Sequence, residues 1–347
     1  MKILLVCHAK IPINTYDEKE RVVWWLGKAL KRAGHEVVYL AKKGSACPFA
    51  EVLILDEKRG LDEQIPEGVD LVHFHDEPSQ PPEKPYLITR YDNAMEACSF
   101  DRNTVFVSAR QAALHGGSVY VHHGIDFDEY GTPELGNRRM YFHFLGNAAW
   151  RGKNVRGAID IASHAGSRLH VIGGTRVNFR KGLRITLSPG VRFHGILNPE
   201  GRNAMLNSSK GLIFPVIWHE PFGMAVPESL YFGCPVFGTP YGALPELLSK
   251  QMSNDRKPHS GNGVVEAFYS EFGCLSVKKS ELLEAVKNAD TCDRVKCNDY
   301  ARTFFSADRM AQDYILLYEK VLEGHSLHKK EPEITEAPED KFLPFGD

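Results

Sequence analysis

The 347-residue sequence lacks features that mark several classes of protein. Its charges nearly cancel, with 42 Lys and Arg residues against 44 Asp and Glu residues, so nothing indicates a dedicated nucleic-acid binder. The seven cysteines are odd in number and scattered, with no Cys-x-x-Cys pair, which favours neither a disulfide framework nor a zinc site. A reducing cytoplasm is therefore the expected location.

A long apolar run and a dinucleotide fingerprint are also missing from the start of the chain. The apolar run ILLV at 3–6 is too short for a signal-peptide core or a membrane span, and it predicts a buried first strand. No Gly-x-Gly-x-x-Gly follows it, which argues against a dinucleotide-binding dehydrogenase. His73 and His75 share one strand face, but without a third ligand they are weak grounds for a metal site.

What the sequence does contain is an alternation of short apolar strands with turns and helices. Short β-branched runs separated in this way predict a mostly parallel sheet covered on both faces. In the first half these runs are ILLVCHA (3–9), HEVVYLA (35–41), AEVLILD (50–56), VDLVHFH (69–75), PYLITRY (85–91), NTVFVSA (103–109) and SVYVHHG (118–124). A helix at 21–34 places Val22, Leu26 and Leu30 on one face.

The same alternation begins again after the polar interval 126–139. We therefore predict an α/β protein with two Rossmann-like, doubly wound domains that face each other across a cleft. The expected parts are an acceptor-side domain (1–137), a nucleotide-sugar-binding domain (138–306), a helix that packs back toward the first domain (307–325) and a mobile tail (326–347). Residues 251–270 look like an inserted polar surface loop.

The stretch HEPFGMAVPE at 219–228 carries the chemistry. Glu220 is predicted in the loop at the carboxyl end of a strand, and Glu228 one turn into the helix that follows. Two carboxylates suit hydrogen bonds from hydroxyl groups. The backbone amides of Gly223, Met224 and Ala225, at the predicted helix start, suit a phosphate. A ligand with sugars on both sides of a diphosphate, a nucleotide sugar, satisfies both requirements.

HEPFGMAVPE and the following SLYFGCPVFGTPYGALPE (229–246) resemble the hallmark of the retaining glycosyltransferases of family four, which have the GT-B fold. Similar pieces occur over roughly the first 320 residues, more weakly in the first half. They are VHHGID (121–126), FLGNAAWRGKNVRGAID (144–160), VRFHGILNPE (191–200) and ARTFFSADRMAQDYILLYEKVL (301–322).

The resemblance implies a role for each residue of the motif. Glu220 would contact the transferred sugar and Glu228 the ribose hydroxyls. The backbone amides of Phe222, Gly223 and Met224 would contact the sugar or the phosphate. Arg151 and Lys153 would neutralise the leaving diphosphate; the alternative is a pair of exposed basic residues before a helix.

Three further residues are candidates for the donor side. Asn147 stands where a basic residue often follows the strand glycine in that family. Gly173 marks either a turn or a donor contact. Thr239 begins a loop at 239–243 whose amides could hold a phosphate, with a plain turn as the alternative.

The acceptor side departs from the family pattern. Members generally carry a Gly-Gly pair after the first strand, where this chain has Asp17 and Glu18. Tyr91 stands near the position of a histidine expected beside the transferred sugar, and His123 replaces an asparagine before Gly-Ile-Asp. His75 is expected to line the same pocket.

The resemblance implies a metal-independent, retaining transfer of a hexose or N-acetylhexosamine from a nucleotide-diphosphate sugar to a cell-surface glycan or glycolipid, with no cofactor beyond that co-substrate. UDP-sugar is the first expectation and GDP-sugar the second. The alternative is a silent protein that binds a nucleotide sugar without transfer. Asp126 and Asp128 have the Asp-x-Asp spacing of metal sites in other glycosyltransferases, but they fall at the domain boundary.

A peripheral membrane contact is a further interpretation. Trp24 shares a predicted helix with Lys28, Lys31 and Arg32, and a helix of this kind can lie on an anionic membrane. A buried tryptophan face with a solvated basic rim is the alternative.

Overall fold

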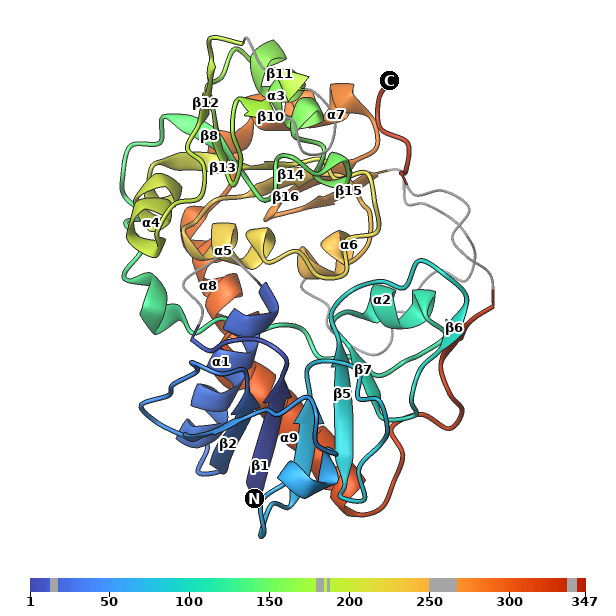
Figure 1. Ribbon diagram of the computed structural model, residues 1–347. Coiled ribbons are helices and arrows are strands. Elements are labelled where there is room, and N and C mark those ends of the chain that lie inside the picture. The colour runs from blue at the N-terminus through green and yellow to red at the C-terminus, as the bar shows by residue number, and fades with distance from the viewer. Residues whose placement is uncertain (13–17, 179–183, 186–187, 250–266, 336–341) are drawn as a thin grey trace. The chain divides into compact units, whose positions relative to one another are not determined.

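The computed structural model describes residues 1–12, 18–178, 184–185, 188–249, 267–335 and 342–347 (Figure 1). The chain divides into two compact units. Unit 1 comprises Met1–Phe127 and Phe305–Pro338, and unit 2 comprises Asp128–Phe304 and Glu339–Asp347. The chain first passes from unit 1 to unit 2 at 127/128, ten residues before the predicted domain boundary at 137/138. Each unit is a sheet flanked by helices, so the two predicted Rossmann-like α/β domains are confirmed.

Unit 1 is built on a parallel sheet in the order β3-β2-β1-β4-β5-β7. Its inner strands are almost wholly buried, as their uninterrupted apolar runs predict. The strands are β1 (Lys2–Cys7), β2 (Glu36–Ala41), β3 (Glu51–Ile54), β4 (Leu71–Phe74), β5 (Tyr86–Arg90) and β7 (Thr104–Phe106).

Helices of unit 1 come from both ends of the chain. Helix α1 buries Val22, Leu26 and Leu30, the predicted face, and packs against α9, which also contacts β5. Ser108 caps the amino terminus of α2 by accepting a hydrogen bond from the Gln111 amide at 3.0 Å. The helical elements are α1 (Glu18–Arg32), η1 (Asp62–Gln64), α2 (Ala109–Leu114) and α9 (Ala307–Leu322), with η2 (Phe127–Tyr130) at the unit boundary.

Unit 2 is built on a sheet in the order β12-β9-β8-β13-β14-β16-β15, parallel except for the edge strand β15. The strands are β8 (Tyr141–Leu145), β9 (Leu169–Ile172), β12 (Val191–Phe193), β13 (Ser209–Phe214), β14 (Val236–Gly238), β15 (Ala267–Ser270) and β16 (Gly273–Ser276). A separate antiparallel pair joins β10 (Val177–Asn178) and β11 (Arg184–Ile185).

The helices of unit 2 follow its strands. Asn198 caps α4 through its side chain, with Pro199 at the first helical position. Helix α5 is buried along its length and packs against α8. The helical elements are η3 (Arg151–Lys153), α3 (Val155–His164), α4 (Pro199–Asn207), α5 (Ala225–Tyr231), α6 (Leu244–Leu247), α7 (Lys279–Lys287), η4 (Ala289–Thr291) and α8 (Arg294–Phe304).

Two sequence expectations are corrected by the fold. The described part of the predicted mobile tail is held by hydrogen bonds: β17 (Glu333–Ile334) pairs antiparallel with β6 (Cys98–Ser99), and the Leu343 amide donates to the Ile217 carbonyl at 2.8 Å. Of the predicted inserted loop at 251–270, residues 251–266 lie outside the described residues, and 267–270 form the edge strand β15. Backbone pairing, which composition does not show, accounts for both differences.

Candidate functional site

Glu220 lies in the loop that follows β13, as predicted, and its carboxylate is held by two side chains. Lys153 Nζ donates to both carboxylate oxygens at 2.7 Å, and the Trp218 indole donates to Oε2 at 2.8 Å. The residue is only 4% exposed. The structure therefore brings together Glu220 and Lys153, which lie 67 positions apart in the sequence.

Lys153 is positioned by the backbone around η3. Asn154 adopts a left-handed conformation (φ 52°), caps α3 by accepting from the Gly157 amide, and donates to the Pro215 carbonyl at 2.8 Å. The Ile217 amide donates to the Gly152 carbonyl at 2.8 Å. These bonds tie the segment after β8 to the loop after β13.

Aromatic rings surround the Lys153 ammonium group. Its Nζ lies 5.7 Å from the ring centre of Trp150, 5.2 Å from Phe214 and 5.5 Å from Trp218. Aromatic rings and a carboxylate both attract a cation, so these neighbours hold the Lys153 side chain in place.

Arg151 differs from Lys153. It is exposed, and its guanidinium carbon lies 4.6 Å above the ring of Phe342. Of the two basic residues predicted for the diphosphate, Lys153 is thus bonded to the sugar-contacting candidate, whereas Arg151 stacks on an aromatic ring.

The loop at 239–243 supports Glu220 from behind. The Ala243 amide donates to the Glu220 carbonyl at 2.9 Å, and Gly242 (φ +65°) lies so close that a Cβ there would be 2.1 Å from that oxygen. Thr239 is fully buried and donates its hydroxyl to the Val216 carbonyl. The Thr239 side chain therefore braces the loop, and the predicted contact through the loop amides stays a prediction.

The Phe-Gly-Met step forms a tight turn into α5. Gly223 has φ +92°, and the helix begins at Ala225, one residue later than predicted. Phe222, Met224 and Ala225 are 1%, 6% and 7% exposed. Their buried side chains fix the turn, so the backbone is the part of this stretch suited to contact a ligand.

Glu228 is buried on α5 in an ion pair that the sequence did not reveal. Its Oε1 accepts from the Tyr130 hydroxyl at 2.5 Å and from Arg202 Nη1 at 3.2 Å, and the Arg202 guanidinium lies 4.5 Å above the Tyr130 ring. The side chains of Glu228 and Arg202 are 3% and 5% exposed. Tyr130 and Arg202 stand in stretches without any recognised motif, so only packing identifies them.

Gly173 and Asn147 shape two adjoining loops after β8 and β9. A Cβ on Gly173 would lie 2.4 Å from the Gly146 carbonyl oxygen, so the close approach of the loops requires glycine. The Asn147 side chain accepts from the Ala149 amide at 3.0 Å and stabilises its own turn. Both residues have a structural explanation, and their predicted donor contacts stay predictions.

A hollow of about 350 Å³ lies beyond the carboxyl ends of β9 and β12, and sequence reasoning missed it. Ligands of open α/β sheets bind at such strand ends. The Arg176 guanidinium is 5.9 Å from the Phe193 ring and donates to the Val191 carbonyl. The residues that line the hollow are Gly174, Thr175, Arg176, Arg192, Phe193, His194 and Gly195.

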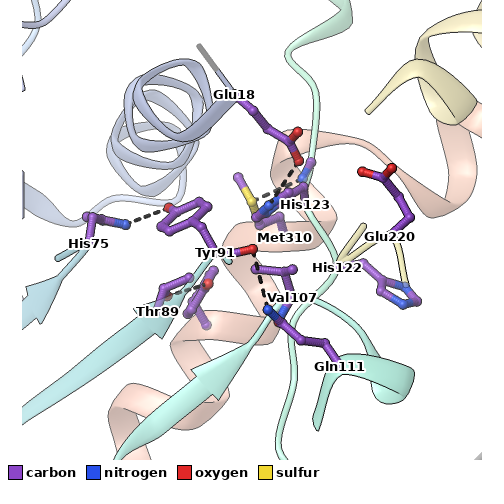
Figure 2. Close-up of polar contacts among 12 residues, drawn as sticks. Glu18, His75, Thr89, Tyr91, Val107, Gln111, His122, His123, Glu220 and Met310 are labelled. Carbon is purple, nitrogen blue, oxygen red and sulfur yellow. Dashed lines mark hydrogen bonds and ion pairs between the residues drawn. The ribbon is translucent and has the colours of Figure 1, made fainter. Parts of the chain in front are cut away.

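In unit 1, the predicted acceptor-side residues form one cluster (Figure 2). His75 Nδ1 and the Tyr91 hydroxyl are hydrogen-bonded at 2.7 Å, and the Tyr91 ring stacks on His123 with centroids 5.2 Å apart. His123 Nε2 lies 3.5 Å from a Glu18 carboxylate oxygen. Glu18, Tyr91 and His75 are thus brought together, while Asp17 lies outside the described residues.

The histidines of this cluster are neutral. Burial lowers the pKa of His123 to about 3, with further lowering by His122 and Arg309. Burial also holds the pKa of His75 well below 6.5. The His123 ring that faces Glu18 at 3.5 Å is therefore uncharged.

The alternative metal sites find no support in the described part of the chain. His73 is hydrogen-bonded on both sides, to Tyr318 and Thr89, at 2.8 Å each. Asp126 pairs with Lys28 at 2.6 Å and with Arg32 at 3.2 Å. Within the described residues, no group of three or more His, Cys, Asp or Glu side chains is placed to hold a metal ion.

The same ion pairs bear on the membrane interpretation. Lys28 and Arg32 of α1 are engaged by Asp126, and Trp24 packs edge-on against Phe49 with ring centroids 4.8 Å apart. This arrangement agrees better with a packed tryptophan and a structural basic rim. In the described ranges no helix combines the length and apolar character needed to span a bilayer.

Comparison with known proteins bears on both units. Residues 140–268 match the family model described as glycosyl transferases group 1. A search of curated proteins returns no match. The chain has the GT-B fold.

Three solved structures illustrate the likeness. AviGT4, a glycosyltransferase involved in avilamycin A biosynthesis, is 19% identical with a TM-score of 0.69 over 93% of this chain and 98% of that one. Sucrose-phosphate synthase from Thermosynechococcus elongatus is 14% identical (TM-score 0.64, 93% and 99% covered). Anabaena HepE in complex with UDP-glucose is also 14% identical (TM-score 0.59, 93% and 100% covered). The family match and the fold together support glycosyl transfer.

Proposed function

We propose that this chain is a retaining glycosyltransferase of the family-four type, which transfers a hexose or N-acetylhexosamine from a nucleotide-diphosphate sugar to a glycan or glycolipid acceptor. UDP-sugar is the first candidate donor and GDP-sugar the second. The observation that carries the proposal is the Glu220 carboxylate, buried at the end of a central strand and bonded to Lys153 and Trp218. A buried charged pair adds little net stability, so its presence at the end of a strand favours a role in ligand binding.

The proposed donor contacts centre on the bonded pair Glu220 and Lys153 of unit 2. Glu220 would accept hydrogen bonds from the transferred sugar. Lys153 and Arg151 would neutralise the leaving diphosphate, because charge that develops there in the transition state is stabilised by fixed cations. Glu228, aided by Arg202, would orient toward the ribose hydroxyls. The hollow beyond β9 and β12 is large enough for part of a nucleotide and offers the Phe193 ring for stacking.

The proposed acceptor contact lies in the cluster of unit 1. Tyr91, His75 and His123 offer uncharged hydrogen-bonding groups, and Glu18 adds a carboxylate that is 38% exposed. Hydroxyl groups of a sugar acceptor match such a surface. In the proposed mechanism the departing phosphate assists deprotonation of the acceptor, so no protein nucleophile and no metal ion take part.

The test is a thermal-shift panel of UDP-, GDP-, ADP- and dTDP-sugars on the purified chain. A specific donor at a hundredfold excess over its dissociation constant adds about 2.7 kcal/mol of stability. We expect a UDP-sugar to raise the melting temperature most, and Glu228→Gln to reduce that shift. A donor shift of equal size in the variant contradicts the ribose role.

Turnover of the selected donor then separates transfer from binding. Release of nucleoside diphosphate with candidate acceptors, unchanged by EDTA, supports a metal-independent transferase. A chain that binds the donor without turning it over is the silent binding protein of the alternative interpretation. A chain that binds no nucleotide sugar shares only the fold with these enzymes.

A further inference from the structure

Residues 342–347, the FLPFGD segment, lie across the carboxyl edge of the unit 2 sheet (Figure 1, dark red near the label C). The Leu343 amide donates to the Ile217 carbonyl at 2.8 Å, after β13, and the Gly346 amide donates to the Val277 carbonyl at 3.1 Å, after β16. The Tyr241 hydroxyl, after β14, donates to the Pro344 carbonyl at 2.5 Å.

The two ends of the FLPFGD segment are also fixed. Phe342 lies under the Arg151 guanidinium at 4.6 Å, after β8. Asp347 Oδ1 accepts from the Ser280 amide at 2.9 Å and from the Ser280 hydroxyl at 2.6 Å, at the start of α7. Because β8, β13, β14 and β16 are neighbours in the sheet, the segment touches the loops of four adjacent strands in turn.

The backbone bonds place the segment in direct connection with the Glu220 loop. Ile217 donates its amide to the Gly152 carbonyl and accepts at its own carbonyl from Leu343. Arg151 precedes Gly152, and Trp218, whose indole holds the Glu220 carboxylate, follows Ile217. Through Ile217, Leu343 is therefore connected by hydrogen bonds to both of the loops that carry the proposed donor residues.

Phe342 acts on Arg151 without blocking it. A guanidinium binds a phosphate along its N–H edge, whereas an aromatic ring covers its face. An arginine that is held by a ring in this way loses less side-chain freedom when the phosphate arrives. The contact thus favours binding of an anion at Arg151.

We propose that the FLPFGD segment is a positioning element of the donor site, in which Phe342 orients Arg151 toward the diphosphate of a nucleotide and Leu343 fixes the loop that leads to Glu220. This inference rests on the proposed function of unit 2. It assigns a role in donor binding to residues outside the segment matched by the glycosyltransferase family model, which ends at residue 268.

The test is a double-mutant cycle with full-length chains, in which UDP binding is measured by calorimetry. Phe342→Ala should weaken UDP binding about twofold to fivefold, the size of a cation–π contact at an exposed site. Phe342→Leu, which keeps an apolar side chain but no π face, should lose most of the same factor. In an Arg151→Gln background, Phe342→Ala should change UDP binding little, because the guanidinium that Phe342 contacts is already absent.

The outcomes separate this inference from the proposed function. Wild-type binding that is unchanged by Phe342→Ala overturns the positioning role and leaves the proposed function intact. Tighter binding by Phe342→Ala also overturns it, since the segment would then be autoinhibitory. An equal loss in both backgrounds shows a merely structural role. Failure of wild type to bind UDP or any other nucleoside diphosphate overturns the proposed function itself.

A measurement without nucleotide gives a second, independent readout. If the segment fixes the loops, Phe342→Ala should raise the rate of hydrogen exchange in peptides that cover 150–154 and 216–220. The exchange rate of a control peptide from β9 should stay the same. Exchange that stays at the wild-type level in both peptides contradicts the positioning role even where nucleotide binds.

Discussion

At the scale of single residues, Glu220 combines burial with charge. Its carboxylate takes three hydrogen bonds from Lys153 and Trp218, so the side chain is fixed before any sugar arrives. Glu220→Gln keeps the shape but removes the charge, and charge-assisted hydrogen bonds to sugar hydroxyls weaken. We expect kcat/KM to fall about 10- to 100-fold, with little change in nucleotide affinity. Steady-state kinetics beside UDP calorimetry checks this, and an unchanged kcat/KM contradicts the proposed contact.

Glu228 and Arg202 allow a prediction of stability. Both side chains are almost wholly buried, so Arg202→Met removes the cation beside the Glu228 carboxylate and should lower the free energy of unfolding by about 3–5 kcal/mol. The exposed Arg156 on α3 is the matched control, and Arg156→Met should change that free energy by no more than about 0.5 kcal/mol. Urea denaturation measures both variants.

The double variant Arg202→Met with Glu228→Leu completes that test. It removes the stranded charge together with its partner, so it should lose less stability than Arg202→Met alone. If the double variant loses as much stability as Arg202→Met and Glu228→Leu lose when their separate losses are added, the two side chains are not energetically coupled. That result would contradict the 3.2 Å contact.

At the scale of elements, the sequence predicted most central strands but not the side-chain contacts between distant residues. The apolar run at 118–124, predicted as a strand, forms only an isolated bridge at Tyr120. Apolar runs at 3–9, 35–41 and 69–75 became β1, β2 and β4 because buried parallel strands need uninterrupted apolar sequence. The loop position of Glu220 followed from strand β13. Arg202, Tyr130 and the FLPFGD segment escaped prediction because their roles depend on contacts over 26 to 191 positions, which local patterns do not encode.

The turn at 239–243 gives a prediction at this scale. Alanine at Gly242 would need a left-handed backbone and would place its Cβ 2.1 Å from the Glu220 carbonyl oxygen. Gly166 has nearly the same φ, +63° against +65°, but a Cβ there would meet nothing within 4 Å. Gly166→Ala should therefore cost only the backbone strain, about 1–2 kcal/mol. Gly242→Ala should cost a further 1–3 kcal/mol, roughly the price of overpacking.

The paired comparison also links the turn to the site. Because the Gly242 clash falls on the backbone of Glu220, Gly242→Ala should reduce turnover as well as melting temperature, whereas Gly166→Ala should reduce only the latter. Equal melting temperatures for the two variants would show that the Glu220 loop can shift without loss of stability. That result would contradict a loop held in place by the hydrogen bond from the Ala243 amide.

At the scale of the whole molecule, the chain passes between the units three times, at 127/128, 304/305 and 338/339. Unit 1 is consequently completed by residues far from its start. Tyr314 and Tyr318 of α9 bond to the buried Thr89 and His73. A fragment ending at the predicted boundary of 137 would lack both tyrosines, so the buried Thr89 and His73 would lose the hydrogen bonds that α9 supplies. This explains why α9 belongs to the first unit.

Both units hold buried neutral histidines, and this sets how stability depends on pH. Burial lowers the pKa of His73 and His123 in unit 1 and of His143 in unit 2 to about 3, from an ordinary value of 6.5. Below pH 6.5 the unfolded chain binds protons that the folded chain refuses. Stability from these groups is thus complete above that pH and is lost as the pH falls toward 3, at about 1.4 kcal/mol per pH unit for each histidine.

Urea unfolding at pH 7.5, about 6 and about 5 measures this loss, and proton uptake on unfolding gives its slope. His73→Gln should reduce the uptake by one proton, because one buried imidazole is gone. Since each unit carries at least one such histidine, the transitions of both units should move to lower urea on acidification. A unit whose transition does not move would have to protonate its histidines while folded, which the full burial of His73 and His143 opposes.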